Sequence, residues 1–512
     1  MLPSFASIAF AIIPLAAAVD PLVNLGYASY HGTRLNNGVT QWMGMPYAAP
    51  PIGKNRFAAP QDLTIADQEY EADTHGPACM GVDTDPSDSS YSEDCLKLDV
   101  YAPSNATPSS RFPVFFYIIG GGFSGSSAPP NGTKLIETSD HAMVVVTLTY
   151  RVGPYGFLGG QVDGLSSNNG LKDQQTALQW TKKHIKQFGG NPDHIVLGGA
   201  SAGGGSVVLQ MANLDNAGYF IGVAAESAAF PAMLTPSEGQ FMFNSVSKQA
   251  GCSKAKDQLS CLRDMDSKAL QKKLQGFTVP SPGASGKAVY MYSPILDGDF
   301  VTDYPYRTFQ QGKFNKMPAI FGDDTYEGNV FMPSNIDSLD EADDFIKDQF
   351  PRISSENFDH IHEDPYYKEK LDQKNYWGFA DRLYGDLRYI CPNLFLPWAF
   401  STKADIDAVW NYRWNIGTAY HTSESNSVWQ GGSDPSPANS IHHFWVSFIK
   451  HLDPNNDKAA SAPLWVPSGK NDRYRHNRML FDVHPHSRME KVSKEQWNAC
   501  VYLRDEGVSL GQ

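Results

Sequence analysis

Three short, almost wholly apolar runs constrain the fold of this chain more than any other feature. Pro113–Ile119 is followed by three glycines, and Met143–Tyr150 is rich in β-branched side chains. Ile195–Leu197 precedes a second glycine-rich turn. Such runs are typical of strands that are buried on both faces of a mostly parallel sheet. Leucine and isoleucine side chains at seven-residue spacing predict a helix over residues 172–187, between the last two strands. This alternation predicts an α/β fold with a large, mostly parallel central sheet and crossover helices.

The second half of the chain is less regular. Residues 338–389 mix charged and aromatic side chains at helical spacing, so we expect helices that pack on the sheet. Proline, glycine and serine cluster at residues 102–111, 279–287 and 431–440, which predicts loops there. No interdomain linker is visible, and we expect residues 19–512 to form a single domain with helical insertions.

Composition excludes two broad classes of protein. The 512 residues carry 41 Lys and Arg against 55 Asp and Glu, which gives a net charge of −14. Nucleic-acid binding needs a basic stripe, so we expect no nucleic-acid partner. Hydrophobic residues make up 41% and aromatic residues 12% of the chain, enough to bury a large core and to exclude intrinsic disorder.

The N-terminal residues have the features of a targeting segment. Residues 1–18 carry no charged side chain and end in three consecutive alanines, the pattern of a signal peptide with its cleavage site. A membrane anchor is the alternative, but the apolar stretch is short and contains Pro14. We therefore expect a secreted, extracellular protein without a stable membrane span. The sequons at Asn105 and Asn131 predict N-glycosylation, which fits secretion.

Six cysteines, an even number, also fit an oxidising compartment. Closeness in sequence suggests two disulfides and leaves a third pair, although sequence alone allows other pairings. The suggested pairs are Cys79–Cys95, Cys252–Cys261 and Cys391–Cys500. No C-x-x-C motif is present, and the closely spaced histidine pairs lack a third ligand at metal spacing. We expect no bound metal.

A serine at a tight turn is the candidate nucleophile. Gly199–Gly203 fits the pattern G-x-S-x-G, follows a strand-like run and precedes the apolar segment Ser206–Met211. Glycines at the flanking positions let strand and helix approach closely enough to expose the Ser201 hydroxyl. Gly507–Gly511 fits the same pattern, but no helix follows it at the end of the chain. We therefore expect Ser201 to be the nucleophile.

The three glycines that follow the first apolar run predict an anion-stabilising loop. A tetrahedral intermediate carries negative charge that preorganised backbone N–H groups stabilise, and glycines allow the backbone to approach it. We expect the N–H groups of Gly121 and Gly122, together with that of Ala202, to form this oxyanion hole.

A serine nucleophile also needs a general base and a carboxylate that orients the base. In a strand-turn-helix setting of this kind the chain order is Ser, then Asp or Glu, then His. Asp323, Asp324 and Glu327 follow the short apolar run Ala319–Phe321, and their spacing does not choose among them. The base has 14 histidines as candidates.

The longest motifs resemble signatures of the type B carboxylesterase/lipase family, which includes cholinesterases and fungal secreted lipases. The matching segments are Trp42–Phe57, Glu93–Leu96, Phe188–Gly203 and Leu452–Asn455. The resemblance covers residues 22–502. It implies the α/β-hydrolase fold, one catalytic domain, carboxylic-ester hydrolysis without a cofactor, and the three disulfides suggested above.

The resemblance also assigns the remaining site residues. The family's Glu-Gly pair matches Glu327, and its histidine loop matches Gly417–Glu424, which selects His421 as the base. It places Ser227 behind the histidine and makes Glu424 a residue that holds the histidine loop in place. Asp323 and Asp324 are then expected to be solvated or helix-capping carboxylates.

Departures from the family pattern limit the classes of substrate that we expect. Ala200 stands where most members have Glu, which weakens the case for a cationic substrate. The segment between Cys79 and Cys95 is short, lacks tryptophan and offers no long flap. We expect an apolar small-molecule ester, in a pocket lined by aromatic side chains such as those of Phe123, Phe230 and Tyr420. The alternatives are a lipase with a reduced flap and, in a different class, a non-catalytic neuroligin-like binding protein. The sequence leaves the oligomeric state open.

Overall fold

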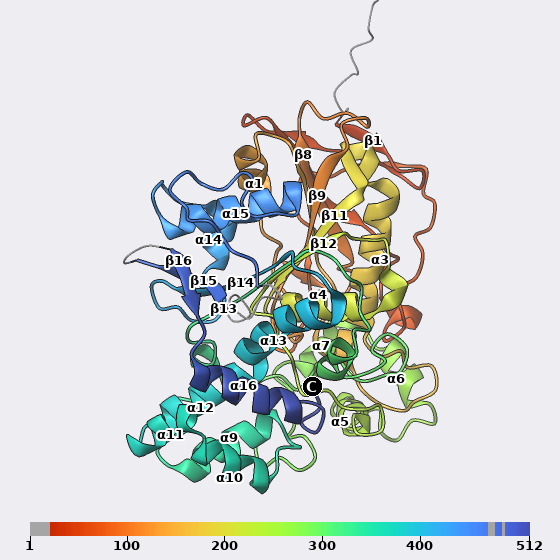
Figure 1. Cartoon of the computed structure of the whole chain (residues 1–512). Helices are drawn as coiled ribbons and strands as arrows, with labels where there is room; N and C mark the ends of the chain where they lie inside the picture. The colour runs from red at the N-terminus through yellow and green to blue at the C-terminus, as the bar shows by residue number, and fades with distance from the viewer. Residues whose placement is uncertain (1–20, 469–476, 484–486) are drawn as a thin grey trace, which may run out of the picture.

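The computed structural model describes residues 21–468, 477–483 and 487–512. The predicted signal peptide at residues 1–18 lies outside these ranges. Figure 1 shows a central sheet flanked by helices, with a cluster of helices below it.

The central sheet has eleven strands in the order β16-β15-β14-β13-β12-β11-β9-β10-β8-β4-β3. The seven strands from β15 to β10 run parallel, and the outer strands pair antiparallel. Parallel strands align their carboxyl ends at one edge, where loops bring distant residues together. The strands are β3 (Thr33–Arg34), β4 (Val39–Pro46), β8 (Lys97–Pro103), β9 (Phe112–Ile118), β10 (Val144–Leu148), β11 (Gly190–Ala200), β12 (Gly222–Glu226), β13 (Ala319–Asp324), β14 (Val409–Asn415), β15 (Asn477–Asp482) and β16 (Arg488–Lys491).

Two small sheets lie apart from the central one. One is three-stranded, with the order β1-β2-β5, and the other pairs β6 with β7. Their strands are β1 (Leu22–Asn24), β2 (Ser29–His31), β5 (Glu69–Glu71), β6 (Ala78–Cys79) and β7 (Tyr91–Ser92).

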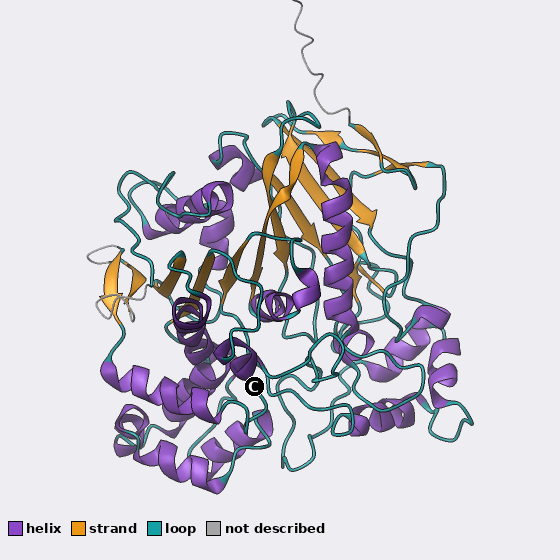
Figure 2. Cartoon of the chain, turned by 45° about the vertical axis from the view of Figure 1, so that its right-hand side comes forward, coloured by secondary structure: helices purple, strands orange, loops and turns teal. Residues whose placement is uncertain are grey.

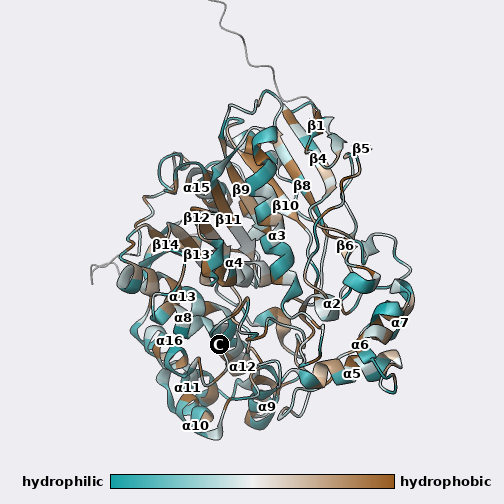
Figure 3. Cartoon of the chain, turned by 90° about the vertical axis from the view of Figure 1, so that its right-hand side faces the viewer, coloured by the Kyte–Doolittle hydropathy of each residue, from teal (hydrophilic) through white to brown (hydrophobic). Residues whose placement is uncertain are grey.

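Helices cover both faces of the central sheet. On one face α3, α4 and α13 contact its strands, and on the other α1 and α15 do so (Figures 1 and 2). Strands β9 and β12 are mostly hydrophobic, whereas most residues of α3 are hydrophilic (Figure 3). The helices are α1 (Thr133–Thr138), α2 (Gly153–Phe157), α3 (Asn169–His184), α4 (Ala202–Ala212), α5 (Gln240–Ala250), α6 (Gln258–Asp264), α7 (Ser267–Leu274), α8 (Pro305–Gln310), α9 (Leu339–Gln349), α10 (Ser355–Glu363), α11 (Pro365–Asp372), α12 (Tyr376–Gly385), α13 (Cys391–Ala399), α14 (Ser425–Gln430), α15 (Pro437–His451) and α16 (Lys494–Glu506).

The helices α9 to α12 pack with α16 as a separate layer at the end of the molecule (Figure 1). They share an apolar cluster of their own, and serine side chains cap α9 and α10 through reciprocal hydrogen bonds. A disulfide between Cys391 and Cys500 joins α13 to α16. Helices α9 to α12 lie in the region that the sequence predicts to be helical, residues 338–389. The expectation that they pack on the sheet is wrong, because they pack on one another and on α16 around an apolar cluster of their own.

Most predicted elements are present, with one local difference. The three apolar runs form β9, β10 and β11, and the helix expected at residues 172–187 is α3 followed by a short 3-10 turn. The loop expected at residues 431–440 is shorter, because α15 already begins at Pro437. Its N-terminus is set by Ser436, whose hydroxyl accepts the N–H of Asn439, and by proline at the first helical position.

The structure forms three disulfides, Cys79–Cys95, Cys252–Cys261 and Cys391–Cys500. These are the pairs that the sequence suggests. Among the described residues, no helix is both long and apolar enough to cross a bilayer.

Candidate active site

Ser201 occupies a strained turn between β11 and α4. Its backbone has φ 57° and ψ −121°, a conformation that non-glycine residues rarely adopt. The turn is tight: a Cβ at Gly203 would lie 2.1 Å from the Ile118 carbonyl oxygen, and a Cβ at Gly199 would lie 2.6 Å from the Gly203 backbone. Only glycine fits at these two positions, and the half-buried Ser201 side chain lies at the carboxyl edge of the sheet.

His421 reaches the serine from the loop that follows β14. Its Nε2 lies 2.7 Å from the Ser201 hydroxyl oxygen. The imidazole packs against two aromatic rings, Tyr389 at 4.4 Å and Phe331 at 5.0 Å between centroids. With its side chain 8% exposed, His421 is held in one orientation that faces the serine.

Glu327, in the loop after β13, is the third residue in this series of hydrogen bonds. Its Oε2 lies 2.5 Å from His421 Nδ1. The other oxygen accepts the Ser227 hydroxyl at 2.7 Å and the Asp324 N–H at 2.8 Å. Both carboxylate oxygens are therefore engaged in a fully buried side chain. Ser227 contacts this carboxylate directly, whereas the sequence reading placed it behind the histidine.

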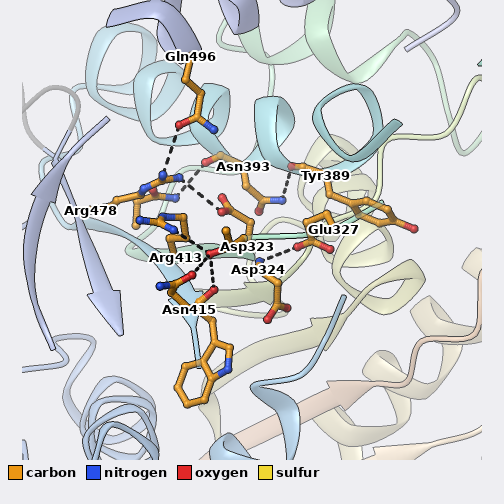
Figure 4. Close-up of polar contacts among 12 residues, drawn as sticks. Asp323, Asp324, Glu327, Tyr389, Asn393, Arg413, Asn415, Arg478 and Gln496 are labelled. Carbon is orange, nitrogen blue, oxygen red and sulfur yellow. Dashed lines mark hydrogen bonds and ion pairs between the residues drawn. The ribbon is translucent and has the colours of Figure 1, made fainter. Parts of the chain in front are cut away.

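The expectation that Asp323 and Asp324 are solvated or capping carboxylates is wrong. Both are fully buried, because β13 extends to Asp324 inside the sheet. Figure 4 shows Asp323 facing Arg478, whose Nη1 lies 3.5 Å from the carboxylate, and Glu327 beside the Asp324 backbone. Burial raises the pKa of both aspartates well above the ordinary value, and the Ser423 hydroxyl donates to Asp324 at 2.6 Å.

Two further carboxyl groups are buried, one at the end of the histidine loop and one at the end of β12. Glu424 accepts the Tyr412 hydroxyl at 2.8 Å, and burial raises its pKa. Glu226, at the end of β12, accepts the Ser425 hydroxyl at 2.9 Å and the Tyr117 hydroxyl at 3.4 Å. Burial, with a contribution from the Glu424 charge, raises the pKa of Glu226 to about 8. Sequence reasoning missed Glu226, although a glutamate at the end of a buried strand was a visible signal.

The glycine loop after β9 lies directly against the nucleophile turn. A Cβ at Gly120 would be 3.1 Å from the Ser201 Cβ. Gly121 and Gly122 have φ of 119° and 61°, and their N–H groups have no acceptor among the described residues. Ala202 is the first residue of α4, so its N–H has no partner within the helix. This arrangement can supply N–H donors to an anion beside Ser201.

A cleft of about 570 Å³ opens beside the nucleophile, and we call it the Ser201 cleft. Its lining differs from the sequence expectation. Phe123 and Phe230 are buried in the core, and Tyr420 lines a different cavity. The residues that line the Ser201 cleft are Tyr117, Ile119, Gly120, Gly121, Gly122, Ser127, Ala128, Pro130, Asn131, Ala200, Ser201, Tyr290, His421, Thr422, Ser425, Asn426, Trp429 and Gln430. The aromatic side chains among them come from β9, from a loop after α7 and from α14, far apart in sequence.

In the described part of the chain, one group of potential metal ligands lies close together: Asp386, Cys391 and Cys500. Because both sulfurs belong to one disulfide, the group offers no thiolate. The second G-x-S-x-G pattern, Gly507–Gly511, follows α16 at the end of the chain, and its Ser509 is exposed away from the cleft.

Similarity to known proteins shows the family to which the chain belongs. A family model described as "Carboxylesterase family" matches residues 19–498. The chain is 35% identical to Aspergillus niger EstA, whose crystal structure superposes with a TM-score of 0.89 over 96% of this chain and 99% of that one.

Curated relatives point the same way. A protein named Secreted lipase 1 from Botryotinia fuckeliana is 29% identical, over 83% of each chain. A mouse cholinesterase is 32% identical, over 70% of this chain and 64% of its own. The fold and family expected from the sequence are confirmed: the chain belongs to the carboxylesterase family, has the α/β-hydrolase fold and is a carboxylic-ester hydrolase.

Proposed function

We propose that this protein is a secreted serine esterase that hydrolyses apolar small-molecule esters through the triad Ser201, His421 and Glu327. The observation that carries the proposal is the continuous chain of contacts from hydroxyl to imidazole to carboxylate, 2.7 Å and then 2.5 Å long. The three residues come from loops after β11, β14 and β13, at the carboxyl edge of one sheet.

Acylation follows from this geometry. The Ser201 hydroxyl donates to His421 Nε2 and loses its proton as its oxygen attacks the ester carbonyl. The imidazolium that forms is stabilised by the buried Glu327 carboxylate, which also holds the Nδ1–H tautomer. The negative charge on the former carbonyl oxygen is stabilised by the N–H groups of Gly121, Gly122 and Ala202; each such donor contributes about 10²–10³ in rate.

The second half of the reaction uses the same groups in reverse. His421 gives its proton to the departing alkoxide, so the alcohol leaves and the acyl group remains on Ser201. A water molecule then gives a proton to His421 and attacks the carbonyl carbon of the acyl-enzyme. The bond from that carbon to the Ser201 oxygen breaks, the carboxylic acid leaves, and His421 returns its proton to Ser201. Ser227 and the Asp324 N–H hold Glu327 throughout, because both donate to the carboxylate oxygen that does not face the histidine.

The cleft favours an uncharged, apolar substrate. The aromatic side chains of Tyr117, Tyr290 and Trp429 line it, and Ala200 leaves no carboxylate beside the nucleophile. The nearby Glu226 has its pKa raised to about 8 by burial, so it is mostly neutral at pH 7 and offers little attraction to a cation.

A lipase with a reduced flap is the second candidate, since several relatives carry the name lipase. An enzyme that works at a lipid surface needs an apolar rim around its cleft. Within the described ranges, none of the large hydrophobic side chains that are exposed lines the Ser201 cleft. Its exposed lining residues include Ser127, Asn131, Asn426 and Gln430, and this polar rim favours dissolved esters.

The proposal includes secretion and a single catalytic domain at residues 19–512. It is supported by the charge-free leader at residues 1–18, by two sequons, and by three disulfides that require an oxidising compartment. A protein named Secreted lipase 4 from Gibberella zeae, 26% identical over 94% of this chain, fits this proposal.

A panel of p-nitrophenyl esters from acetyl to palmitoyl tests the function. We expect saturable turnover of dissolved esters, with no jump in rate above the solubility limit, whereas such a jump would favour the lipase. Ser201→Ala should abolish turnover with the melting temperature unchanged. Ser509→Ala, in the second G-x-S-x-G pattern, is the matched control and should keep full activity. Absence of turnover on every ester would favour the neuroligin-like binding protein.

A further inference from the structure

One of the two sequons lies in the wall of the Ser201 cleft. The loop from Ser127 to Asn131 connects the oxyanion glycines to α1 and forms one side of the cleft. Helix α14 also lines the cleft, through Asn426, Trp429 and Gln430. Asn131 is exposed and lies two residues before the start of α1, which packs against α14.

The hydrogen bonding of the Asn131 side chain is compatible with an attached glycan. Its Oδ1 accepts the backbone N–H of Thr133 at 2.9 Å, which fixes the plane of the amide. Its Nδ2 has no hydrogen-bond partner among the described residues. A glycan attached to Nδ2 leaves the Oδ1 contact intact, so the modification costs the fold no hydrogen bond.

We propose that Asn131 carries an N-linked glycan that narrows the entrance of the Ser201 cleft and selects against bulky esters. This inference rests on the proposed function, because it concerns access to the same nucleophile. An N-linked glycan is bulky and hydrophilic. Attached to one wall of the Ser201 cleft, whose volume is about 570 Å³, the glycan excludes long or branched ester groups. It also prevents the rim of the cleft from binding to a lipid surface.

The covalent step is a transfer from a lipid-linked oligosaccharide diphosphate during secretion. Asn131 Nδ2 loses one proton and forms a bond to the anomeric carbon of the first sugar. The bond from that carbon to the diphosphate oxygen breaks, and the lipid diphosphate leaves with the electron pair. No oxidation or reduction takes place.

The second sequon provides a control within the same chain. Asn105 is also exposed, but it follows β8 and does not line the cleft. The neighbouring Ala106 packs against Gly189, the residue before β11, whereas Ser201 follows the end of that strand. A glycan on Asn105 therefore stands at the opposite edge of the sheet and leaves the cleft open.

The test compares four secreted proteins: the native chain, Thr133→Ala, Thr133→Ser and Asn105→Gln. Thr133→Ala removes the sequon but keeps the Asn131 amide and the backbone N–H that it binds, whereas Thr133→Ser keeps a sequon. Mass analysis of the peptide that contains Asn131 should show a glycan in the native, Thr133→Ser and Asn105→Gln proteins, and none in Thr133→Ala. An unmodified Asn131 in the native protein would overturn the proposal.

The kinetic readout is the ratio of kcat/KM for p-nitrophenyl laurate to that for p-nitrophenyl acetate. We expect this ratio to rise about five- to tenfold in Thr133→Ala, and in native protein whose glycans are trimmed to one sugar by an endoglycosidase. It should stay within about twofold of native in Thr133→Ser and Asn105→Gln. An unchanged ratio in Thr133→Ala, with equal melting temperatures, would refute the filter.

The two proposals fail in distinguishable ways. If the native protein turns over acetate and the ratio does not change, the esterase assignment stands and the filter is overturned. If no ester is turned over by any of the four proteins, the proposed function fails and the filter fails with it. The peptide mass then still decides whether Asn131 is modified.

Discussion

Replacing Glu226 with glutamine should make the protein more stable at alkaline pH and leave its stability at acidic pH almost unchanged. The side chain is fully buried, between Tyr117 of β9 and Ser425 of α14, and it faces Glu424. Burial raises the pKa of Glu226 to about 8 from an ordinary value of 4.5. Glutamine has nearly the same shape and carries no charge at any pH; it keeps one acceptor oxygen and replaces the other with an NH2 group, which can donate to a neighbouring hydroxyl oxygen.

The sign and the size of the effect follow from proton linkage. Because the folded-state pKa lies above the unfolded value, the folded state binds the proton more tightly, and stability is lost as pH rises from about 4.5 through 8. As pH rises from 5.5 to 8, the titration of this single group lowers the free energy of unfolding by about 3 kcal/mol. With an unfolding entropy of about 2 cal/mol/K per residue, the chain of 512 residues loses about 3 °C of Tm from this cost.

The measurement is the Tm of the native protein and of Glu226→Gln at half-unit steps from pH 5 to pH 8.5. The other buried acids, including Asp324 and Glu424, contribute to both curves. Because the charges of Glu226 and Glu424 interact, the difference between the curves reports Glu226 together with its coupling to Glu424. We expect the variant to gain about 3 °C relative to the native protein across this range. A Tm difference that does not change with pH would refute the assignment of a neutral, buried carboxyl group at this position.

Three other substitutions test separate parts of the account. Ser227→Ala removes a hydrogen bond to Glu327 and should lower kcat about tenfold with KM unchanged, as steady-state kinetics will show. Gly122→Ala places a Cβ 2.0 Å from an aromatic carbon at φ 61°, which should displace an oxyanion donor and lower kcat about a hundredfold without raising KM. Arg56→Met leaves buried Glu93 unpaired and should lower stability by about 3–5 kcal/mol in thermal unfolding, while activity of the folded protein at 25 °C is kept. A normal kcat in the first two variants, or a native Tm in the third, would contradict the contacts described.

Local sequence signals predicted the scaffold of the site well. The apolar run before the three glycines predicts β9, and the run before Ser201 predicts β11. Each run is followed by glycines that indicate a turn. The acid was different: spacing left Asp323, Asp324 and Glu327 equivalent, and the family resemblance selected Glu327. Its contact with His421 depends on the order of β13 and β14 in the sheet, a non-local property that no single segment encodes.

The errors at Asp323 and Phe123 share one physical cause, which is that distant segments decide burial. From the sequence, Asp323 is expected at the surface. In the structure β15 brings Arg478, which is 155 positions later in the sequence, next to its carboxylate. Phe123 adjoins the oxyanion loop, yet its ring packs on Phe157 in the core. By contrast, the missed start of α15 was a local error, because Ser436 followed by proline is a helix-start signal that was present in the sequence.

The central claim is that Ser201 is made nucleophilic by His421, and labelling with a fluorophosphonate probe tests it most directly. The account predicts a single covalent adduct, found by peptide mass analysis on the peptide of Ser201. It also predicts that His421→Ala slows labelling at least about a hundredfold while the melting temperature stays near native. An adduct at another residue, no adduct, or unchanged labelling without the imidazole would contradict it.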